Sequence, residues 1–333
     1  MVRLSMMMVD FLYKKLFQKI LFKMDPEDAH NIAIFFLKIF SQINLDLSPK
    51  KSKPFEFMGI RFKNQIGIAA GFDKNAEVFR ALGNLGFGFV EVGSVTLRPQ
   101  KGNPKPRVFR IINEKSIINH FGLNNYGAYE VLKNIEKWDK RNIVLGINIA
   151  KNNDVDFNDA HKNIADCYKI LKDVGDFFVI NISCPNVGMF EGDISNYIRK
   201  IIEEVKDISD KKPLFIKISP DLSDCDIKNI VEVCVNMKCG IVATNTSKRR
   251  DIIKDEKFKK IEGGASGICL RDVSLSVLKK IRSYSSDIPV ISVGGIFDKN
   301  DIEERKKLGA FLFEIYTSFV YEGPGIIEKL LID

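Results

Sequence analysis

Residues 65–95 read QIGIAAGFDKNAEVFRALGNLGFGFVEVGSV, and their pattern decides the fold class. Two short apolar runs, 65–71 and 89–95, lie on either side of a more polar, helix-like stretch. Continuous apolar strands joined by helices are typical of parallel strands, because the connecting helices cover both faces of the sheet. The stretch therefore predicts a strand–helix–strand unit.

The same alternation continues along the rest of the chain. Six further runs have strand character: IVLGINI (143–149), FFVINIS (177–183), LFIKISP (214–220), GIVATNT (240–246), PVISVGG (289–295) and FLFEIYT (311–317). Eight strands with intervening helices over about 270 residues predict an α/β fold, the (β/α)8 TIM barrel. An open doubly wound sheet is the alternative, and it is less favoured because no G-x-G-x-x-G motif opens the first strand–helix unit.

The first 48 residues follow a different pattern. Residues 9–23 place apolar side chains at helical spacing between lysines, which predicts a short amphipathic helix. A second helix is expected to begin after Asp25 as N-cap, with Pro26 in its first turn, and to end near Ser41. We therefore expect a helical domain at 1–48 and a catalytic barrel at 49–333. Capping the barrel core and facing a membrane are both open roles for the helices, and they are compatible.

Positive charge is concentrated near the N-terminus. The chain of 333 residues has a formal net charge of +8, and residues 1–63 hold eleven Lys or Arg against six Asp or Glu. A basic, apolar segment favours an anionic membrane surface over nucleic acid as its partner. Four lysines interrupt the one stretch that approaches a membrane span. We expect a peripheral protein at the cytoplasmic face of the cell membrane, with no nucleic-acid partner.

The six cysteines form no C-x-x-C pair, and with three well-separated histidines they give no zinc-ligand pattern. We expect a reducing compartment and no bound metal. Cys184 differs from the others because it precedes a proline on a polar loop, between Asn181 and Asn186. Most free cysteines are small buried apolar residues, but a thiol in this setting can act as a base or nucleophile. With no hydrolase dyad recognisable, proton abstraction beside a cofactor is the better interpretation.

Polar residues and glycines gather where the predicted strands end, which is where barrel enzymes bind their ligands. The first six strand ends bring Ala69-Ala70-Gly71-Phe72-Asp73-Lys74, Gly93-Ser94, Asn148, Asn181, Lys217 and Thr244-Asn245-Thr246. Lys217 lies within the apolar run FIKIS, where an unpaired ammonium would be costly. We therefore expect Lys217 to face an anionic or electron-rich partner.

The last two strands end in Gly294-Gly295 and Tyr316-Thr317, and GGASG (263–267) lies in the preceding loop. Glycines let backbone N–H groups approach a phosphate closely, and barrels commonly bind phosphate after their seventh and eighth strands. Tight turns that need positive φ are the alternative reading of a single glycine pair. Three such elements together favour a phosphate-bearing cofactor.

Ten segments resemble, in order, the motifs of dihydroorotate dehydrogenases. They are AAGFDKN (69–75), RPQKGNPKPRVFR (98–110), INHFGLNNYG (118–127), GINIAKN (146–152), NISCPN (181–186), KISPDLS (217–223), ATNTS (243–247), GGASG (263–267), SVGGI (292–296) and IYTSFVYEGP (315–324). The similarity runs from Asp25 to the C-terminus. DPEDAH (25–30) and the two N-terminal helices resemble the quinone-dependent class in particular.

The resemblance implies roles for individual residues. It implies one FMN per chain, held by Ala69, Ala70, Gly71, Phe72, Asp73, Ser94, Asn148, Asn181, Lys217, Thr244, Gly267, Gly295, Tyr316 and Thr317. It implies a dihydroorotate site formed by Lys74, Asn119, His120, Phe121, Gly122, Leu123, Asn181, Asn186, Asn245 and Thr246. It implies a quinone site at His30, Arg110 and Tyr316.

The implied reaction removes a proton from C5 of dihydroorotate, with Cys184 as the base, and moves a hydride from C6 to the flavin. Lys217 would compensate the negative charge of the reduced flavin, and a membrane quinone would reoxidise it. The product is orotate, an intermediate of pyrimidine biosynthesis.

Four positions depart from the pattern of the quinone class. Cys184 stands where that class has serine and the soluble class has cysteine, while Ser94, Phe121 and Leu123 replace the more usual Thr, Met and Phe. Because a thiol has a pKa of about 8.5, we expect kcat to rise at lower pH than in serine enzymes.

Three other interpretations remain. A soluble dihydroorotate dehydrogenase using fumarate or NAD would not need residues 9–41. A dihydrouridine synthase is also an FMN barrel with a catalytic cysteine, but it carries an RNA-binding domain after the barrel. A phosphate-binding barrel with a structural or regulatory role would hold no flavin.

Overall fold

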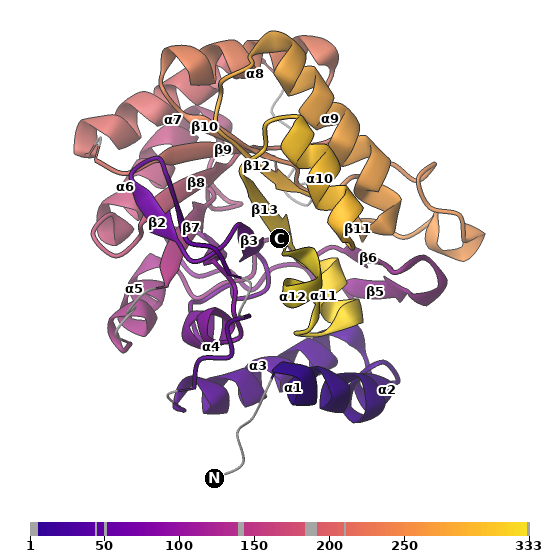
Figure 1. Ribbon diagram of the computed structural model, residues 1–333. Helices are drawn as coiled ribbons and strands as arrows, with labels where there is room; N and C mark the ends of the chain where they lie inside the picture. Colours follow the sequence, from indigo (N-terminus) through magenta and orange to yellow (C-terminus); the bar gives the residue numbers. More distant parts are fainter. Residues whose placement is uncertain are drawn as a thin grey trace.

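A computed structural model describes residues 6–43, 45–49, 52–138, 143–183, 192–209 and 211–331. Eight parallel strands close into a barrel in the order β10-β12-β13-β3-β4-β7-β8-β9 (Figure 1). Their bounds are β3 (Ile66–Ile68), β4 (Phe89–Val95), β7 (Val144–Ile149), β8 (Phe177–Asn181), β9 (Leu214–Ile218), β10 (Gly240–Ala243), β12 (Val290–Val293) and β13 (Leu312–Ile315). Each lies within one of the eight predicted runs, so the TIM-barrel prediction is confirmed.

Helices surround the barrel and cover the outer faces of its strands. They are α4 (Phe79–Asn84), α5 (Ala128–Glu136), α6 (Ala160–Leu171), α7 (Ile194–Ile208), α8 (Asp224–Asn236), α9 (Arg271–Tyr284), α10 (Lys299–Lys307), α11 (Thr317–Glu322) and α12 (Ile326–Leu330). Short 3-10 turns lie at Ile112–Glu114, Phe157–Asp159, Glu256–Phe258 and Ile268–Leu270. In α7, Ile198, Ile201, Ile202 and Val205 are buried at i, i+3, i+4 and i+7, which is the pattern of a helix with one apolar face.

Side chains inside the barrel alternate with side chains that face the helices. Inside the barrel, Phe177 packs edge to face against Phe89 on one side and Phe215 on the other, and Phe62 contacts Phe89 in the same way. Phe62 belongs to an antiparallel hairpin of β1 (Phe55–Phe57) and β2 (Ile60–Phe62), which joins this inner cluster. The sequence did not predict this hairpin.

A small antiparallel sheet stands beside the barrel. It consists of β5 (Val108–Ile111), β6 (Ser116–Asn119) and β11 (Gly264–Gly267), in the order β11-β6-β5 (Figure 1). Since β11 lies about 145 positions after β6, the sheet ties the segment after β4 to the segment after β10. It brings 118–119 and 263–267, two of the motif segments, into direct contact.

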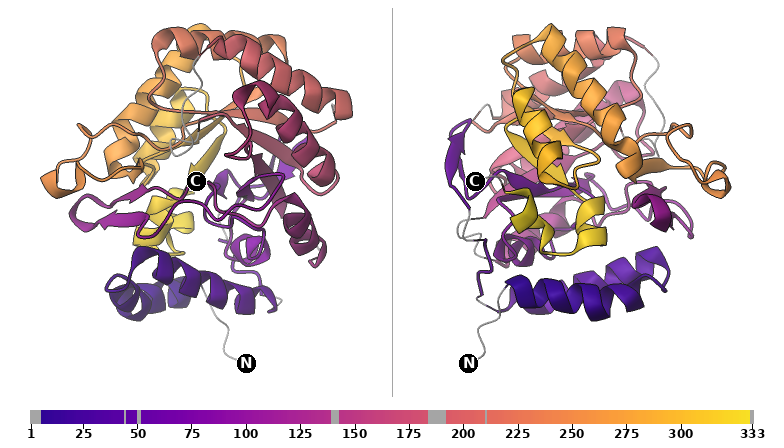
Figure 2. Two further views of the ribbon diagram at one scale, coloured as in Figure 1. Left: turned by 180° about the vertical axis from the view of Figure 1, so that it is seen from behind. Right: turned by 45° about the vertical axis from the view of Figure 1, so that its right-hand side comes forward.

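Both predicted N-terminal helices are present. The first consists of α1 (Met6–Leu12), a π-helical turn η1 (Tyr13–Phe17) and α2 (Gln18–Leu21), and the second is α3 (Pro26–Ser41). Asp25 caps α3 by accepting hydrogen bonds from the N–H groups of Glu27 and Asp28, as predicted. Figure 2 shows these helices side by side along one side of the molecule, next to α11 and α12. Among the described residues, no helix is long and apolar enough to cross a membrane.

Candidate active site

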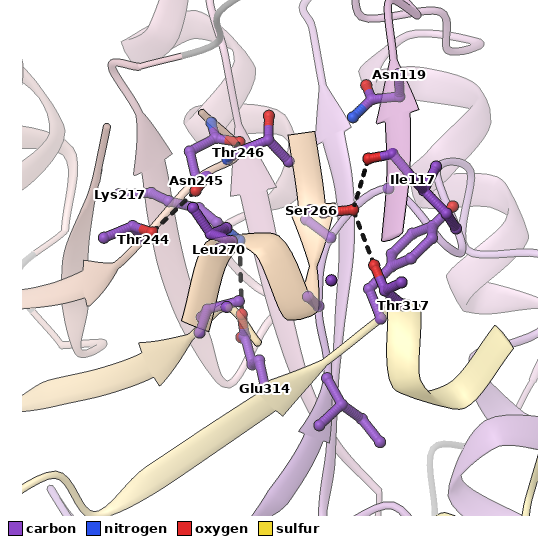
Figure 3. Close-up of a pocket in the computed structure, with 18 of the residues that line it drawn as sticks. Ile117, Asn119, Lys217, Thr244, Asn245, Thr246, Ser266, Leu270, Glu314 and Thr317 are labelled. Atoms are coloured by element: carbon purple, nitrogen blue, oxygen red, sulfur yellow. Dashed lines mark hydrogen bonds and ion pairs between the residues drawn. The ribbon is translucent and has the colours of Figure 1, made fainter. Parts of the chain in front are cut away.

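The carboxyl ends of the barrel strands enclose one cavity (Figure 3). Twelve of the predicted cofactor residues line it: Ala69, Ala70, Gly71, Ser94, Asn148, Asn181, Lys217, Thr244, Gly267, Gly295, Tyr316 and Thr317. The predicted substrate residues Lys74, Asn119, Phe121, Leu123, Asn245 and Thr246 line it as well. The barrel therefore brings together residues that lie up to about 250 positions apart, because parallel strands all end at the same rim.

Lys217 lies at the floor of this cavity between two acidic side chains. Its Nζ is 3.0 Å from Oε1 of Glu91 on β4 and 3.5 Å from Oε2 of Glu314 on β13, and all three residues are buried. Burial alone would lower the pKa of Lys217, but the two carboxyl groups outweigh it and raise the pKa. The prediction that Lys217 faces an anionic partner is therefore confirmed, and the ammonium is charged.

Amide and hydroxyl groups form a connected set on one wall. Asn181 Nδ2 donates to Ser94 Oγ at 3.0 Å, and Asn245 Nδ2 donates to Asn181 Oδ1 at 3.2 Å. Ser183 Oγ donates to the carbonyl of Lys217 at 2.8 Å, which joins the amides to the floor. Such fixed amides can pair with a ring that presents alternating donors and acceptors.

The opposite wall is rich in glycine and hydroxyl groups. Ser266 Oγ lies 2.8 Å from Thr317 Oγ1, and both side chains are labelled in Figure 3. Gly267 and Gly295 both have positive φ. A Cβ on either would lie 2.4 Å from the backbone of a neighbouring segment, so no other residue fits. Backbone close to the cavity with two hydroxyl donors suits the phosphate end of a cofactor.

On the substrate side, Phe121 lies between two cations. Lys74 Nζ is 4.0 Å from the centroid of its ring and the Arg107 guanidinium is 5.5 Å from it. Arg107 is held in turn by Glu27 of α3 through two hydrogen bonds of 3.0 and 2.8 Å. Burial lowers the pKa of Lys74 to about 8, so the lysine is a cation that an incoming carboxylate would stabilise.

Some predicted residues lie elsewhere. Asp73 accepts hydrogen bonds from the N–H groups of Glu77 and Val78, each at 2.8 Å, so it stabilises the turn after β3 and does not line the cavity. Phe72 packs against Tyr316 and Phe319, and the cavity lining includes neither His120 nor Gly122. Cys184 and Asn186 lie outside the described residues.

Two of the three residues predicted for a quinone site contact the same aromatic ring, and the third holds a turn of the N-terminal segment. His30 and Tyr316 both pack against Phe72, with ring centroids 5.2 and 5.8 Å from it. Burial lowers the pKa of His30 to about 3, with a further contribution from the Lys74 charge, so the imidazole is neutral. Arg110 donates to the carbonyls of Leu21 and Met24 and therefore holds the turn between α2 and α3.

A family model described as dihydroorotate dehydrogenase matches residues 54–333. The chain belongs to this family. Two relatives named dihydroorotate dehydrogenase (quinone) are those of Aliivibrio fischeri strain MJ11, 37% identical over 93% of this chain and 96% of the relative, and of Marinomonas sp. strain MWYL1, 38% identical over 95% of both.

Solved structures of the dihydroorotate dehydrogenase family agree with the fold. The ligand-free enzyme of Eimeria tenella is 32% identical, with a TM-score of 0.85 over 92% of this chain and 93% of that one. The same enzyme in complex with ferulenol is 31% identical, with a TM-score of 0.83 over 92% and 90%.

Sequence reasoning missed Glu91, Glu314 and Ser266 in this dihydroorotate dehydrogenase site. The signal for the two glutamates was present, since each interrupts an apolar strand run, FVEVGSV and FLFEIYT, as Lys217 does. A charged residue in a buried strand calls for a partner of opposite charge. Three such residues in three strands could have been matched with one another.

Proposed function

We propose that the chain oxidises dihydroorotate to orotate with a bound FMN and passes the electrons to a membrane quinone. The observation that carries the proposal is the cavity at the strand ends, which joins a buried lysine, a wall of amides and a glycine-rich wall with hydroxyls. These three parts match an electron-accepting ring, a pyrimidine and a phosphate.

The residues present fit FMN. The phosphate would lie at Gly267, Gly295 and Thr317, where a Cβ would clash or a hydroxyl is available. The ring would lie over Ala69, Ala70 and Gly71 and reach Lys217 at the floor. Asn148 Oδ1 is buried, lines the cavity and has no hydrogen-bond partner among the described residues, which leaves an acceptor for a cofactor N–H group. When bound, FMN would accept the hydride.

The substrate would be bound through its carboxylate and through its ring. Lys74 supplies the cation for the carboxylate of dihydroorotate, and Asn119, Asn181 and Asn245 supply paired donors and acceptors for its ring. Cys184, the residue after Ser183, is the base that we propose for the C5 proton, in line with its place in NISCPN. Lys217 would hold positive charge where electrons arrive.

The N-terminal helices supply the membrane part of the proposal. Phe11, Leu16, Ile20, Phe35 and Phe36 are all at least half exposed. Lys15, Lys19 and Lys23 of the same segment are also exposed. An exposed apolar surface with lysines beside it suits the interface of an anionic bilayer. Quinone would reach the flavin past His30 and Tyr316, which both contact Phe72.

The acceptor can be tested by anaerobic stopped-flow. The bound flavin is first reduced with dihydroorotate, and the reduced protein is then mixed separately with a soluble quinone, fumarate and NAD. We expect flavin bleaching by dihydroorotate and fast reoxidation by quinone alone. Reoxidation by fumarate or NAD would place the protein in the soluble class, and no bleaching by dihydroorotate would refute the substrate.

Membrane attachment needs a separate test. Sedimentation with vesicles of phosphatidylcholine and phosphatidylglycerol should pull down the wild-type protein, and Phe35→Glu should abolish this at unchanged thermal stability. Tyr129→Glu is the matched control, because Tyr129 is 72% exposed on α5 and does not belong to the N-terminal helices. Equal loss in both variants, or no binding by the wild type, would contradict the assignment of the surface.

A further inference from the structure

The floor of the cavity contains one more acidic group than basic groups. Glu91 and Glu314 are fully buried, Lys217 is nearly so, and no other charged side chain of the described residues lies within ion-pair distance of the three. Two ionised carboxylates with one ammonium would leave an uncompensated negative charge in the barrel interior, which is very costly. One of the two carboxyls must therefore carry a proton.

The hydrogen bonds identify which carboxyl is ionised. Glu91 Oε1 accepts from Lys217 Nζ at 3.0 Å and from Asn148 Nδ2 at 2.6 Å, whereas Glu314 has a longer ion pair with Lys217, at 3.5 Å, and a contact with the Glu91 carboxyl. A carboxylate with two donors is stabilised in its charged form. Burial would raise the pKa of Glu91, but the Lys217 charge and these bonds leave it lowered. Burial and the charge on Glu91 raise the pKa of Glu314 well above its usual range.

The remaining oxygen atoms support the same assignment. Glu91 Oε2 and both oxygens of Glu314 are buried and have no hydrogen-bond partner in the part of the chain that the structure describes. A proton on Glu314 directed at Glu91 supplies the missing donor for one and the missing acceptor for the other. The strands that flank these residues place Gly67, Gly146 and Val242 in register with them, and none of these side chains titrates.

We propose that Glu314 is a neutral carboxylic acid that shares its proton with Glu91, and that the pair fixes the charge around Lys217 beneath the cavity. The Glu91 carboxylate then balances the charge of Lys217, and Glu314 stays neutral but can ionise if Glu91 is lost. Glu314 lines the cavity, while Glu91 does not, so the proton lies on the side from which a reduced cofactor would present negative charge. Both residues are positioning residues, since they act through Lys217. Their influence on the flavin rests on the proposed function, but the shared proton does not.

Infrared spectroscopy tests the proton directly. Full-length protein labelled with ¹³C at its glutamate carboxyls is compared with unlabelled protein at pH 7.5, and the protonated-acid carbonyl band that shifts with the label is assigned to glutamate. We expect one such band in the wild type and its loss in Glu314→Gln. We also expect its loss in Glu91→Gln, because Glu314 must then ionise to balance Lys217. Absence of the band in the wild type, or its persistence in either variant, overturns the proposal.

The bound flavin provides a second, independent reading. Each single variant leaves one carboxyl to balance Lys217, whereas the double variant Glu91→Gln/Glu314→Gln leaves none. The midpoint potential of the flavin should therefore change little in each single variant. In the double variant it should rise, and the shift should be several-fold larger than in either single variant. A shift in Glu314→Gln as large as that in the double variant contradicts the proposal. If dihydroorotate proves not to be the substrate, the infrared result still stands or fails by itself.

Discussion

The barrel and the N-terminal helices treat their apolar side chains in opposite ways. Along the barrel strands, nearly every apolar side chain is buried, either among the helices or in the inner cluster. In residues 6–43, nine large apolar side chains are between 40% and 60% exposed: Phe11, Leu12, Leu16, Phe17, Ile20, Phe35, Phe36, Ile39 and Ile43. A core that is complete within the chain needs no partner, whereas an apolar surface of this kind indicates one outside the chain.

The contacts that join the two regions are both apolar and polar. Met6 is buried in the main core cluster, and Val9, Ile34 and Leu37 pack against that cluster. Tyr13 Oη donates to the carbonyl of Val320, Gln18 Nε2 to that of Tyr321, and Glu27 binds Arg107. The apolar contacts bury one side of the helices, and the polar contacts fix their orientation because they need specific geometry. The helices are therefore packed on the barrel by one face and exposed on the other, which is the arrangement that the proposed membrane contact requires.

The largest effect that we expect comes from the barrel floor. Lys217→Met would leave the buried Glu91 and Glu314 without a cation, and breaking a buried ion pair from one side costs about 3–5 kcal/mol. We expect this loss in urea unfolding, together with loss of the yellow flavin on purification. Lys200→Met, on an exposed position of α7, should change neither. Flavin retention with wild-type stability would show that the barrel floor tolerates the missing charge.

The joint between the two regions should show the next effect. Glu27→Gln removes the charge that faces the buried Arg107, and we expect a loss of about 3 kcal/mol. Because Arg107 stacks beside Phe121 in the cavity lining, the KM for dihydroorotate should rise more than kcat falls. Asp28→Ala is the control, since Asp28 is largely exposed and lies 3.7 Å from Lys105. Equal effects of the two variants on KM would remove the joint from the substrate site.

Acid should weaken the same joint through His30. Well above pH 6.5 the imidazole is neutral in both the folded and unfolded states, so it adds no pH dependence to the stability. Below 6.5 the unfolded chain takes up a proton that the folded protein refuses until about pH 3, so stability falls as pH falls. At pH 5 this amounts to about 2 kcal/mol. The stability difference between wild type and His30→Asn, measured by urea unfolding at pH 7.5 and pH 5, should shift by that amount, and an equal difference at both pH values would contradict it.

Sequence patterns predicted the parts of the structure that are specified locally. Continuous apolar runs that alternate with helix-like stretches predicted all eight barrel strands, and Asp25 before Pro26 predicted the start of α3. The sheet of β5, β6 and β11 escaped prediction because 116–119 pairs with 264–267, and such a pairing leaves no local pattern. The same holds for Lys217 and its two carboxyls. Each residue shows the need for a partner, but only the closed barrel shows which one.

The smallest effect on stability is expected from truncating an exposed apolar side chain of the N-terminal helices. Leu16 is 52% exposed on the N-terminal helix, and Leu278 is fully buried on α9 against the barrel. Truncation of Leu278 to alanine should cost about 2–5 kcal/mol, because it leaves a cavity in a packed core. Leu16→Ala should stay within about 0.5 kcal/mol of the wild type, since little of its surface leaves water on folding.

Thermal unfolding of both variants, with and without anionic vesicles, measures this contrast. Vesicles should stabilise the wild type and the Leu278→Ala protein more than the Leu16→Ala protein. The reason is that Leu16 would contact lipid in the bound state, whereas Leu278 is buried and would not. If Leu16→Ala instead destabilises the free protein as much as Leu278→Ala does, the helices pack as part of the core, and their exposed surface does not indicate an external partner.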